Sequence, residues 1–367
     1  MDIQLDEGKI LHSFLKILAI PSHSQQEASV ADFIKEWCRS LNIDVLEDDT
    51  KGQTGSNTGN LICTIKGTNK DILPIFFTAH MDTIEAQQVL PSIENGYVQT
   101  DGTTALGADD KAGIIALLEG IEYIIHSNEP YGDIQLIFTV CEEQGLIGAR
   151  ALDMGAIKGV FGYTVDADEP VGTCITHSPA IDIVTITVTR ESQKEGMDVH
   201  EAISNIIRHI ARNPVEETLH VSIIGFQENK ELKNGGIDVT IELKSINKDD
   251  IQYYVERLKE YTKKCIQATQ LVYMMDVEHI CSNYQYEQQD SVLAFASRAA
   301  KSLGLPLKYK ERLDVSDANV FTSEHIPTMT LGAGYEHIHT KKERIAISEL
   351  YDLTRFIIGI SLSRNAE

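Results

Sequence analysis

Short apolar runs that alternate with helix-like segments constrain the fold of this chain more than any other feature. Residues 72–78, 134–140 and 160–165 are typical of buried strands, and residues 112–125 carry an apolar stripe at helical spacing. Towards the C-terminus, residues 291–363 return to this texture with a helix, a strand and a closing helix. Because strands that alternate with helices build parallel sheets, we predict an α/β domain with a mixed, largely parallel sheet.

The middle of the chain has a different order. Val and Ile alternate with Thr over residues 184–189, as in a half-exposed strand, and isoleucines recur at helical spacing over residues 203–210. Two strand patterns, a helix and a further strand follow, which completes the β-α-β-β-α-β order of a ferredoxin-like fold. We therefore place a small domain at residues 180–284, inserted into an α/β domain made of residues 1–179 and 285–367.

Composition and termini exclude several classes of protein. A net charge of −23 over 367 residues argues against nucleic acid binding, since phosphates require a basic surface. No apolar run approaches the ~20 residues of a membrane span, and the acidic N-terminus lacks a signal-peptide pattern, so we expect a cytoplasmic protein without a membrane partner. The six cysteines are scattered without a CxxC pair, which predicts reduced thiols rather than disulfides.

Acidic and imidazole side chains gather where the predicted strands end. His80 and Asp82 follow the first apolar run, Glu142 and Glu143 follow the second, and Asp166 follows the third. Ligands bind at the carboxyl ends of parallel strands, so these side chains are candidates for one site. Residues two apart in an extended chain point the same way, so His80 can bind a metal while Asp82 holds its other ring nitrogen.

Two further segments contribute candidate ligands. Asp109 stands close to the start of the helix predicted over residues 112–125, where it can also serve as the N-cap. His337 and His339 follow a glycine-containing segment, and either one can complete a metal site. Asp168 is an alternative to Asp166. Each segment alone is equally typical of a polar strand end or a solvated loop, and only their combination points to one site.

The combined side chains favour metal-assisted hydrolysis. Imidazole and carboxylate ligands together suit zinc, although cobalt and manganese can also bind such ligands. Two ions ~3.5–4 Å apart, bridged by a carboxylate and a water, are a recurring aminopeptidase device. Neighbouring side chains diverge at a strand end, so one of Glu142 and Glu143 can bind metal while the other acts as a base toward the water.

The order and local sequence of these segments resemble a known family. Residues 106–113 read LGADDKAG and residues 163–166 read YTVD. These stretches resemble the zinc exopeptidases that include peptidase T, aminoacylase, succinyl-diaminopimelate desuccinylase and carboxypeptidase G, with peptidase T the closest in appearance. The resemblance covers nearly the whole chain and includes the inserted domain, which forms a lid in the family.

The resemblance implies two zinc ions and a role for each candidate residue. In that scheme, the zinc ligands are His80, Asp109 as the bridge between the two ions, Glu143, Asp166 and His339. Asp82 orients His80, and Glu142 is the general base that takes a proton from the attacking water and passes it to the leaving amine. His337 is then a neighbour of the site rather than a ligand.

The resemblance also implies a substrate and a partner. It indicates an aminopeptidase of short unblocked peptides, in particular tripeptides, that forms a homodimer through the lid. The family has a histidine where residues 189–194 have none, Gly-Gly where residues 314–315 stand, and an arginine for the substrate carboxylate where Lys244 stands. Two alternatives follow from these departures: a deacylase of N-acyl amino acids, or a metal-binding homodimer without turnover.

Overall fold

The computed structural model describes residues 3–84, 88–191, 198–212, 218–232, 234–267 and 269–363, and the chain folds into two compact units. The first unit comprises Met1–Thr176, Gln285–Glu311 and Ser316–Glu367, and the second comprises His177–Tyr284 and Arg312–Val315. Residues 192–194, part of the segment in which the family's lid histidine is missing, lie outside the described residues.

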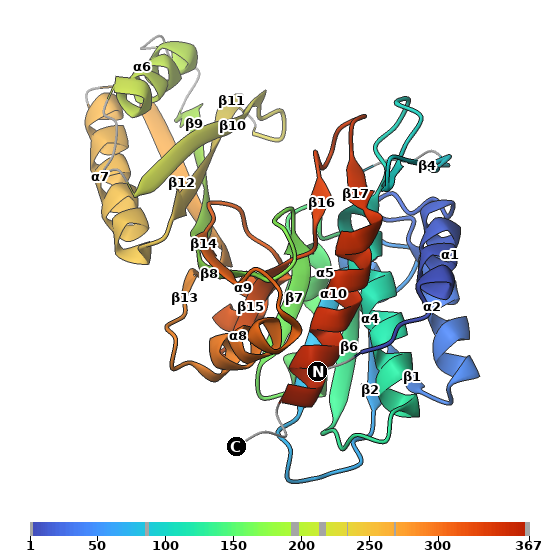
Figure 1. Cartoon of the computed structure of the whole chain (residues 1–367). Coiled ribbons are helices and arrows are strands. Elements are labelled where there is room, and N and C mark those ends of the chain that lie inside the picture. Colours follow the sequence, from blue (N-terminus) through green and yellow to red (C-terminus); the bar gives the residue numbers. More distant parts are fainter. Residues whose placement is uncertain are drawn as a thin grey trace. The chain divides into compact units, whose positions relative to one another are not determined.

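The first unit is built on one mixed sheet, shown in Figure 1. Its described strands lie in the order β1-β2-β6-β3-β7-β15-β8-β13, with β14 paired to β8. The four central strands β6, β3, β7 and β15 are parallel, β1 and β2 pair antiparallel with their neighbours, and β8 pairs antiparallel with β15. The strand bounds are β1 Asp44–Glu47, β2 Leu61–Ile65, β3 Ile75–His80, β6 Ile134–Thr139, β7 Gly162–Ala167, β8 Thr173–Ser178, β13 Tyr284–Gln285, β14 Lys308–Glu311 and β15 Thr328–Gly332.

Helices cover both faces of this sheet, which confirms the predicted α/β fold. One face packs against α4 and α8, with α1 and α10 packed on α4, and the opposite face packs against α9. Neighbouring residues of β3 show the two faces: Phe77 joins the core on the α4 side, and the ring of Phe76 packs at a tilt against Phe321 of α9. The helix bounds are α1 Glu7–Leu18, α2 Ala28–Ser40, α3 Lys51–Thr54, α4 Ala108–His126, α5 Ile147–Ala151, η1 Met154–Ala156, α8 Ser291–Leu303, α9 Asp317–Ser323 and α10 Ile347–Leu362. A strand buried on both faces explains the continuous apolar runs of the sequence.

A small antiparallel sheet lies at one end of the first unit. Its described strands follow the order β16-β17-β5-β4, with bounds β4 Ser92–Glu94, β5 Tyr97–Gln99, β16 Tyr335–Glu336 and β17 Arg344–Ala346. The pairing of Tyr335 with Ile345 holds the ends of the loop that carries His339.

The second unit has the element order β-α-β-β-α-β. Its sheet follows the order β10-β11-β9-β12, and every pair is antiparallel. The element bounds are β9 Ala180–Arg190, α6 Val199–Arg212, β10 Leu219–Glu228, β11 Gly236–Ser245, α7 Lys248–Ile266 and β12 Leu271–Cys281. Val184, Ile186 and Val188 are buried under the two helices, as their alternation with Thr indicates.

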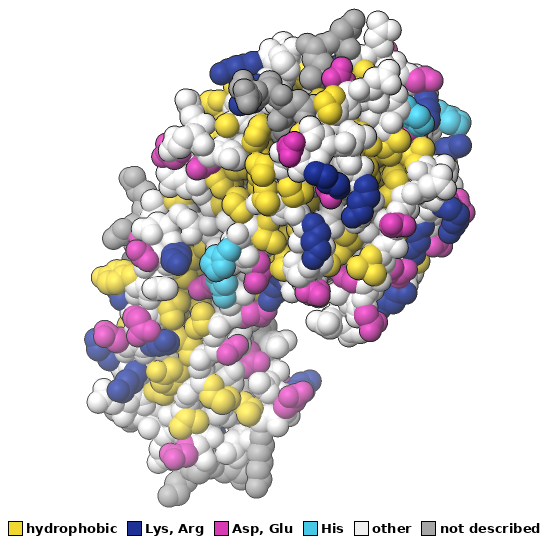
Figure 2. Space-filling model, turned by 90° about the horizontal axis from the view of Figure 1, so that it is seen from below, with side chains coloured by type: hydrophobic (Ala, Val, Ile, Leu, Met, Phe, Trp, Pro, Cys, Tyr) yellow, Lys and Arg dark blue, Asp and Glu magenta, His cyan; other side chains and the backbone are white. Residues whose placement is uncertain are grey.

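On the face shown in Figure 2, acidic and basic side chains are mixed among apolar and polar ones. Among the described helices, none is long and apolar enough to cross a membrane.

Candidate metal centre

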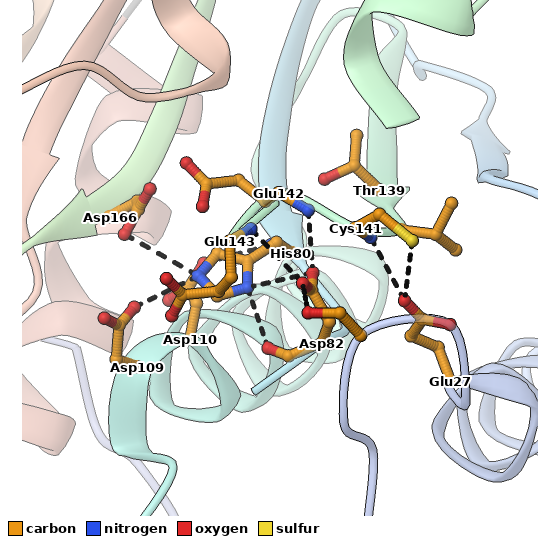
Figure 3. Close-up of polar contacts among 12 residues, drawn as sticks. Glu27, His80, Asp82, Asp109, Asp110, Thr139, Cys141, Glu142, Glu143 and Asp166 are labelled. Carbon is orange, nitrogen blue, oxygen red and sulfur yellow. Dashed lines mark hydrogen bonds and ion pairs between the residues drawn. The ribbon is translucent and has the colours of Figure 1, made fainter. Parts of the chain in front are cut away.

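Three neighbouring parallel strands place the candidate side chains at one edge of the sheet. β3 ends at His80, β6 leads into Glu142 and Glu143, and Asp166 is the penultimate residue of β7. Figure 3 shows His80 between Asp82 on one side and Asp109 and Asp166 on the other. The convergence expected at the carboxyl ends of parallel strands is therefore present.

Asp109 reaches this edge from the distorted start of α4. Gly107 is the N-cap, in the left-handed region at φ 72°, and Asp109 and Asp110 have non-helical backbone angles. The carboxylate that accepts from the first turn is that of Asp110, from Gly113 N at 3.2 Å, so the Asp109 carboxylate does not cap the helix. The buried carboxylate of Glu343 accepts hydrogen bonds from the backbone N–H groups of Leu106 (2.9 Å), Gly107 (3.1 Å) and Asp109 (3.2 Å). Glu343 thereby joins the Asp109 segment to the loop that carries His339.

His339 reaches the same cluster from the loop between β16 and β17. Its Nε2 atom lies 3.1 Å from Asp109 Oδ2 and 2.7 Å from Glu143 Oε1. Among the described residues, Asp166 belongs to a group of candidate metal ligands and Asp168 does not. Neither His337 nor His339 belongs to such a group of described residues, but His339 makes the two contacts above. The geometry therefore favours Asp166 by its grouping and His339 by its contacts to Asp109 and Glu143.

Asp109 lies between two halves of the cluster. His80 Nε2 lies 3.1 Å from Asp109 Oδ1 and 3.9 Å from Asp166 Oδ1. His339 Nε2 instead faces Asp109 Oδ2, and Glu143 Oε1 lies beside the same nitrogen. Each oxygen of the Asp109 carboxylate thus faces a different histidine, and each histidine has a further carboxylate beside it. This donor set fits two divalent cations bridged by Asp109.

Glu142 lies beside this cluster with its side chain turned away from Glu143. The ligand atoms of His80, Glu142 and Asp166 lie within 4.8 Å of one another, as do those of His80, Asp109 and Glu143. Burial, reinforced by Asp166, raises the pKa of Glu142 well above its ordinary value. A carboxyl group with a raised pKa is suited to accept and return a proton, although its position also allows metal contact.

The electrostatics of the cluster depend on its two histidines. Burial opposes ionisation of Asp109, but hydrogen bonds from His339 and His80 outweigh it and lower the pKa of Asp109. The same contacts from Asp109 and Glu143 raise the pKa of His339 to about 10. Burial and the neighbouring Asp109 raise the pKa of Asp166. Protons therefore neutralise part of the buried negative charge, a task that metal ions can also perform.

Asp82 supports both His80 and the turn with the two glutamates. Its backbone carbonyl lies 2.9 Å from His80 Nδ1, whereas its carboxylate Oδ1 lies 3.5 Å from that atom. The carboxylate accepts hydrogen bonds from Glu142 N (3.0 Å), Glu143 N (3.2 Å) and Ser24 Oγ (2.7 Å). Asp82 can therefore fix the ring orientation of His80. It also holds the backbone of Glu142 and Glu143, a role that the spacing of His80 and Asp82 in the sequence did not indicate.

Two residues that no sequence pattern marked also support the centre. Glu27 Oε1 accepts a hydrogen bond from Cys141 N at 3.1 Å and thereby fixes the turn before Glu142 (Figure 3). The buried Tyr335 hydroxyl lies 3.2 Å from Asp109 Oδ1 and 3.0 Å from Asp166 Oδ1. Burial, together with these carboxylates, raises the pKa of Tyr335, so the phenol keeps its proton and donates it.

Lys244 belongs to the second unit rather than to the unit that holds the cluster. It lies on β11, and its Nζ atom is 3.3 Å from Glu242 Oε1. Its contact with the substrate carboxylate stays a prediction.

Replacing Asp166 by Asn is expected to weaken metal binding by about 10- to 100-fold or more, because a candidate ligand loses its charge. The matched variant Asp168→Asn, two residues further on, should bind metal within about threefold of the wild type. Competition with a chromophoric chelator measures both affinities. Stronger loss in Asp168→Asn would assign the ligand to Asp168 instead.

The fold and this cluster define a metal-dependent hydrolase. Residues 76–362 match the family described as Peptidase family M20/M25/M40, and the chain belongs to this family. It is a peptidase T-like metallopeptidase of that family, as the LGADDKAG and YTVD segments indicated.

Three relatives span nearly the whole chain. The uncharacterized protein YqjE of Bacillus subtilis is 35% identical over 365 residues, which cover 97% of this chain and 98% of that protein. The structure of aminopeptidase PepT from Bacillus cereus superposes with a TM-score of 0.88 at 30% identity and covers 98% and 99% of the two chains. The structure of a tripeptidase from Staphylococcus aureus has the same TM-score, 0.88, at 28% identity, with 99% and 100% covered.

Proposed function

We propose that this protein is an aminopeptidase that removes the N-terminal residue of short unblocked peptides, in particular tripeptides, with two zinc ions. The observation that carries the proposal is the position of Asp109, whose Oδ1 faces His80 and whose Oδ2 faces His339. Asp166 lies beside His80, and Glu143 lies beside His339. Such a bridged pair of sites is the arrangement that two-metal aminopeptidases use.

The bound ions would polarise the scissile carbonyl and lower the pKa of a water molecule. Glu142 lies beside His80 and Asp166 and is assigned the proton transfer: it accepts the proton of the attacking water and delivers it to the leaving amine. Asp82 holds the backbone of Glu142 in place through the 3.0 Å hydrogen bond to its N–H. Burial of Glu142 raises its pKa, which makes its carboxylate a stronger acceptor for the proton of the attacking water.

The peptide substrate is proposed from the relatives. Structures of an aminopeptidase and of a tripeptidase superpose over nearly the whole chain. The second unit is proposed to act as a lid and dimerisation domain, and Lys244 is assigned to the substrate carboxylate, as a single positive charge rather than a bidentate fork. Light scattering that gave a monomer mass at micromolar concentration would contradict the dimer.

A substrate panel tests the proposal. Zinc-loaded protein is incubated with unblocked di-, tri- and tetrapeptides and with N-acyl amino acids, and mass spectrometry identifies the products. Release of the N-terminal residue from tripeptides is the expected result. Cleavage of the acylated compounds alone would assign the protein to the deacylases, and no cleavage by metal-loaded protein would support the homodimer without turnover.

A further inference from the structure

The Tyr335 hydroxyl lies on one side of the candidate metal centre. Asp109 Oδ1 accepts contacts from Tyr335 (3.2 Å) and from His80 (3.1 Å), and Asp166 Oδ1 lies 3.0 Å from the same hydroxyl. The other histidine, His339, faces Asp109 Oδ2. Within the described part of the chain, the hydroxyl of Tyr335 therefore bonds to the half formed by His80 and Asp166 rather than to the half formed by Glu143 and His339.

The backbone fixes Tyr335 and Asp166 relative to each other. The N–H of Ala333 donates to Ala167 O at 2.7 Å, and the N–H of Gly334 donates to Glu169 O at 2.9 Å. Gly334 has φ 85°, and a Cβ atom at this position would lie 2.6 Å from the side chain of Glu349. The segment before Tyr335 is thus joined to the segment after Asp166, and only glycine fits the turn between them.

We infer that Tyr335 is a positioning residue for one metal site: its single O–H, shared between Asp109 Oδ1 and Asp166 Oδ1, holds these carboxylates in the orientation that binds the ion on the His80 side. This inference rests on the proposed two-metal function. A buried hydroxyl needs a hydrogen-bond partner, and here both partners are candidate ligands. Partners that orient metal ligands are typically worth ~10- to 100-fold in metal affinity.

The variant Tyr335→Phe removes the hydroxyl and keeps the ring. Stepwise zinc affinities are measured by competition with a chromophoric chelator. One of the two affinities should weaken by ~10- to 100-fold, and the other should stay within about threefold. The matched control is Tyr163→Phe, because Tyr163 is equally buried and its hydroxyl donates to Val292 O at 2.7 Å, away from the cluster. Both zinc affinities of this control should equal those of the wild type.

Variants that lack one of the two histidines show which zinc site is weakened. In His339→Ala, which keeps the His80 side, added Tyr335→Phe should weaken the remaining zinc site by the same ~10- to 100-fold. In His80→Ala, it should change the remaining affinity by less than about threefold. Equal affinities in wild type and Tyr335→Phe, or equal weakening of both sites, would overturn the inference. A wild-type protein that binds no zinc would instead overturn the proposed function.

Discussion

Replacing Glu142 by Gln is expected to lower kcat by about 10²- to 10⁴-fold while both metal ions stay bound, because the amide cannot accept the proton of the attacking water. The side chain keeps its size, and the Asp82 contact to the Glu142 backbone is unaffected. Peptide hydrolysis gives kcat, and elemental analysis of the purified variant gives the metal content.

Glu143→Gln is the matched variant for this test. Glu143 Oε1 lies 2.7 Å from His339 Nε2, so we expect loss of the ion on the His339 side together with loss of activity. If Glu142→Gln lost metal and Glu143→Gln kept it, the assigned roles of the two glutamates would have to be exchanged. The grouping of Glu142 with His80 and Asp166 makes this comparison necessary.

The second large effect is expected at Asp109. Asp109→Asn removes the charge of the one carboxylate that faces both histidines, so both ions should bind weakly, and kcat/KM should fall by more than ~100-fold. Elemental analysis after gel filtration and a peptide assay measure the two quantities.

A second buried aspartate controls for the Asp109 test. Asp317 is as buried as Asp109, and its Oδ2 atom accepts a hydrogen bond from Thr139 Oγ1 at 2.6 Å. It belongs to no candidate ligand group among the described residues, so Asp317→Asn should keep both ions. Wild-type metal content in Asp109→Asn would refute a bridging carboxylate at this position.

Long apolar patterns predicted the fold well. The helix expected over residues 291–303 is α8 (Ser291–Leu303), and the strand expected over residues 134–140 is β6 (Ile134–Thr139). The α/β class is confirmed, and the parallel pairing is confined to the centre of the sheet. β4, β5, β16 and β17 were missed because strands of two or three residues are too short to show a period.

The candidate ligands could be predicted from the sequence because most of them follow strands that end at one edge of the sheet. The contacts that support these ligands could not be predicted from the sequence. Tyr335 is 226 residues from Asp109 in sequence, and their contact exists only once the loop after β15 folds beside β7. The metal roles of His80, Asp109, Glu143, Asp166 and His339 stay predictions, as does the role of Lys244.

Anomalous diffraction from zinc-soaked crystals tests the two-metal centre most directly. We predict two peaks at the zinc edge, one ~2.0–2.2 Å from His80 Nε2 and Asp166 and the other at the same distance from His339 Nε2 and Glu143, with Asp109 bound to both. No peak in this cluster, or a zinc ion held by Glu142 in place of Glu143, would contradict a two-metal centre bridged by Asp109.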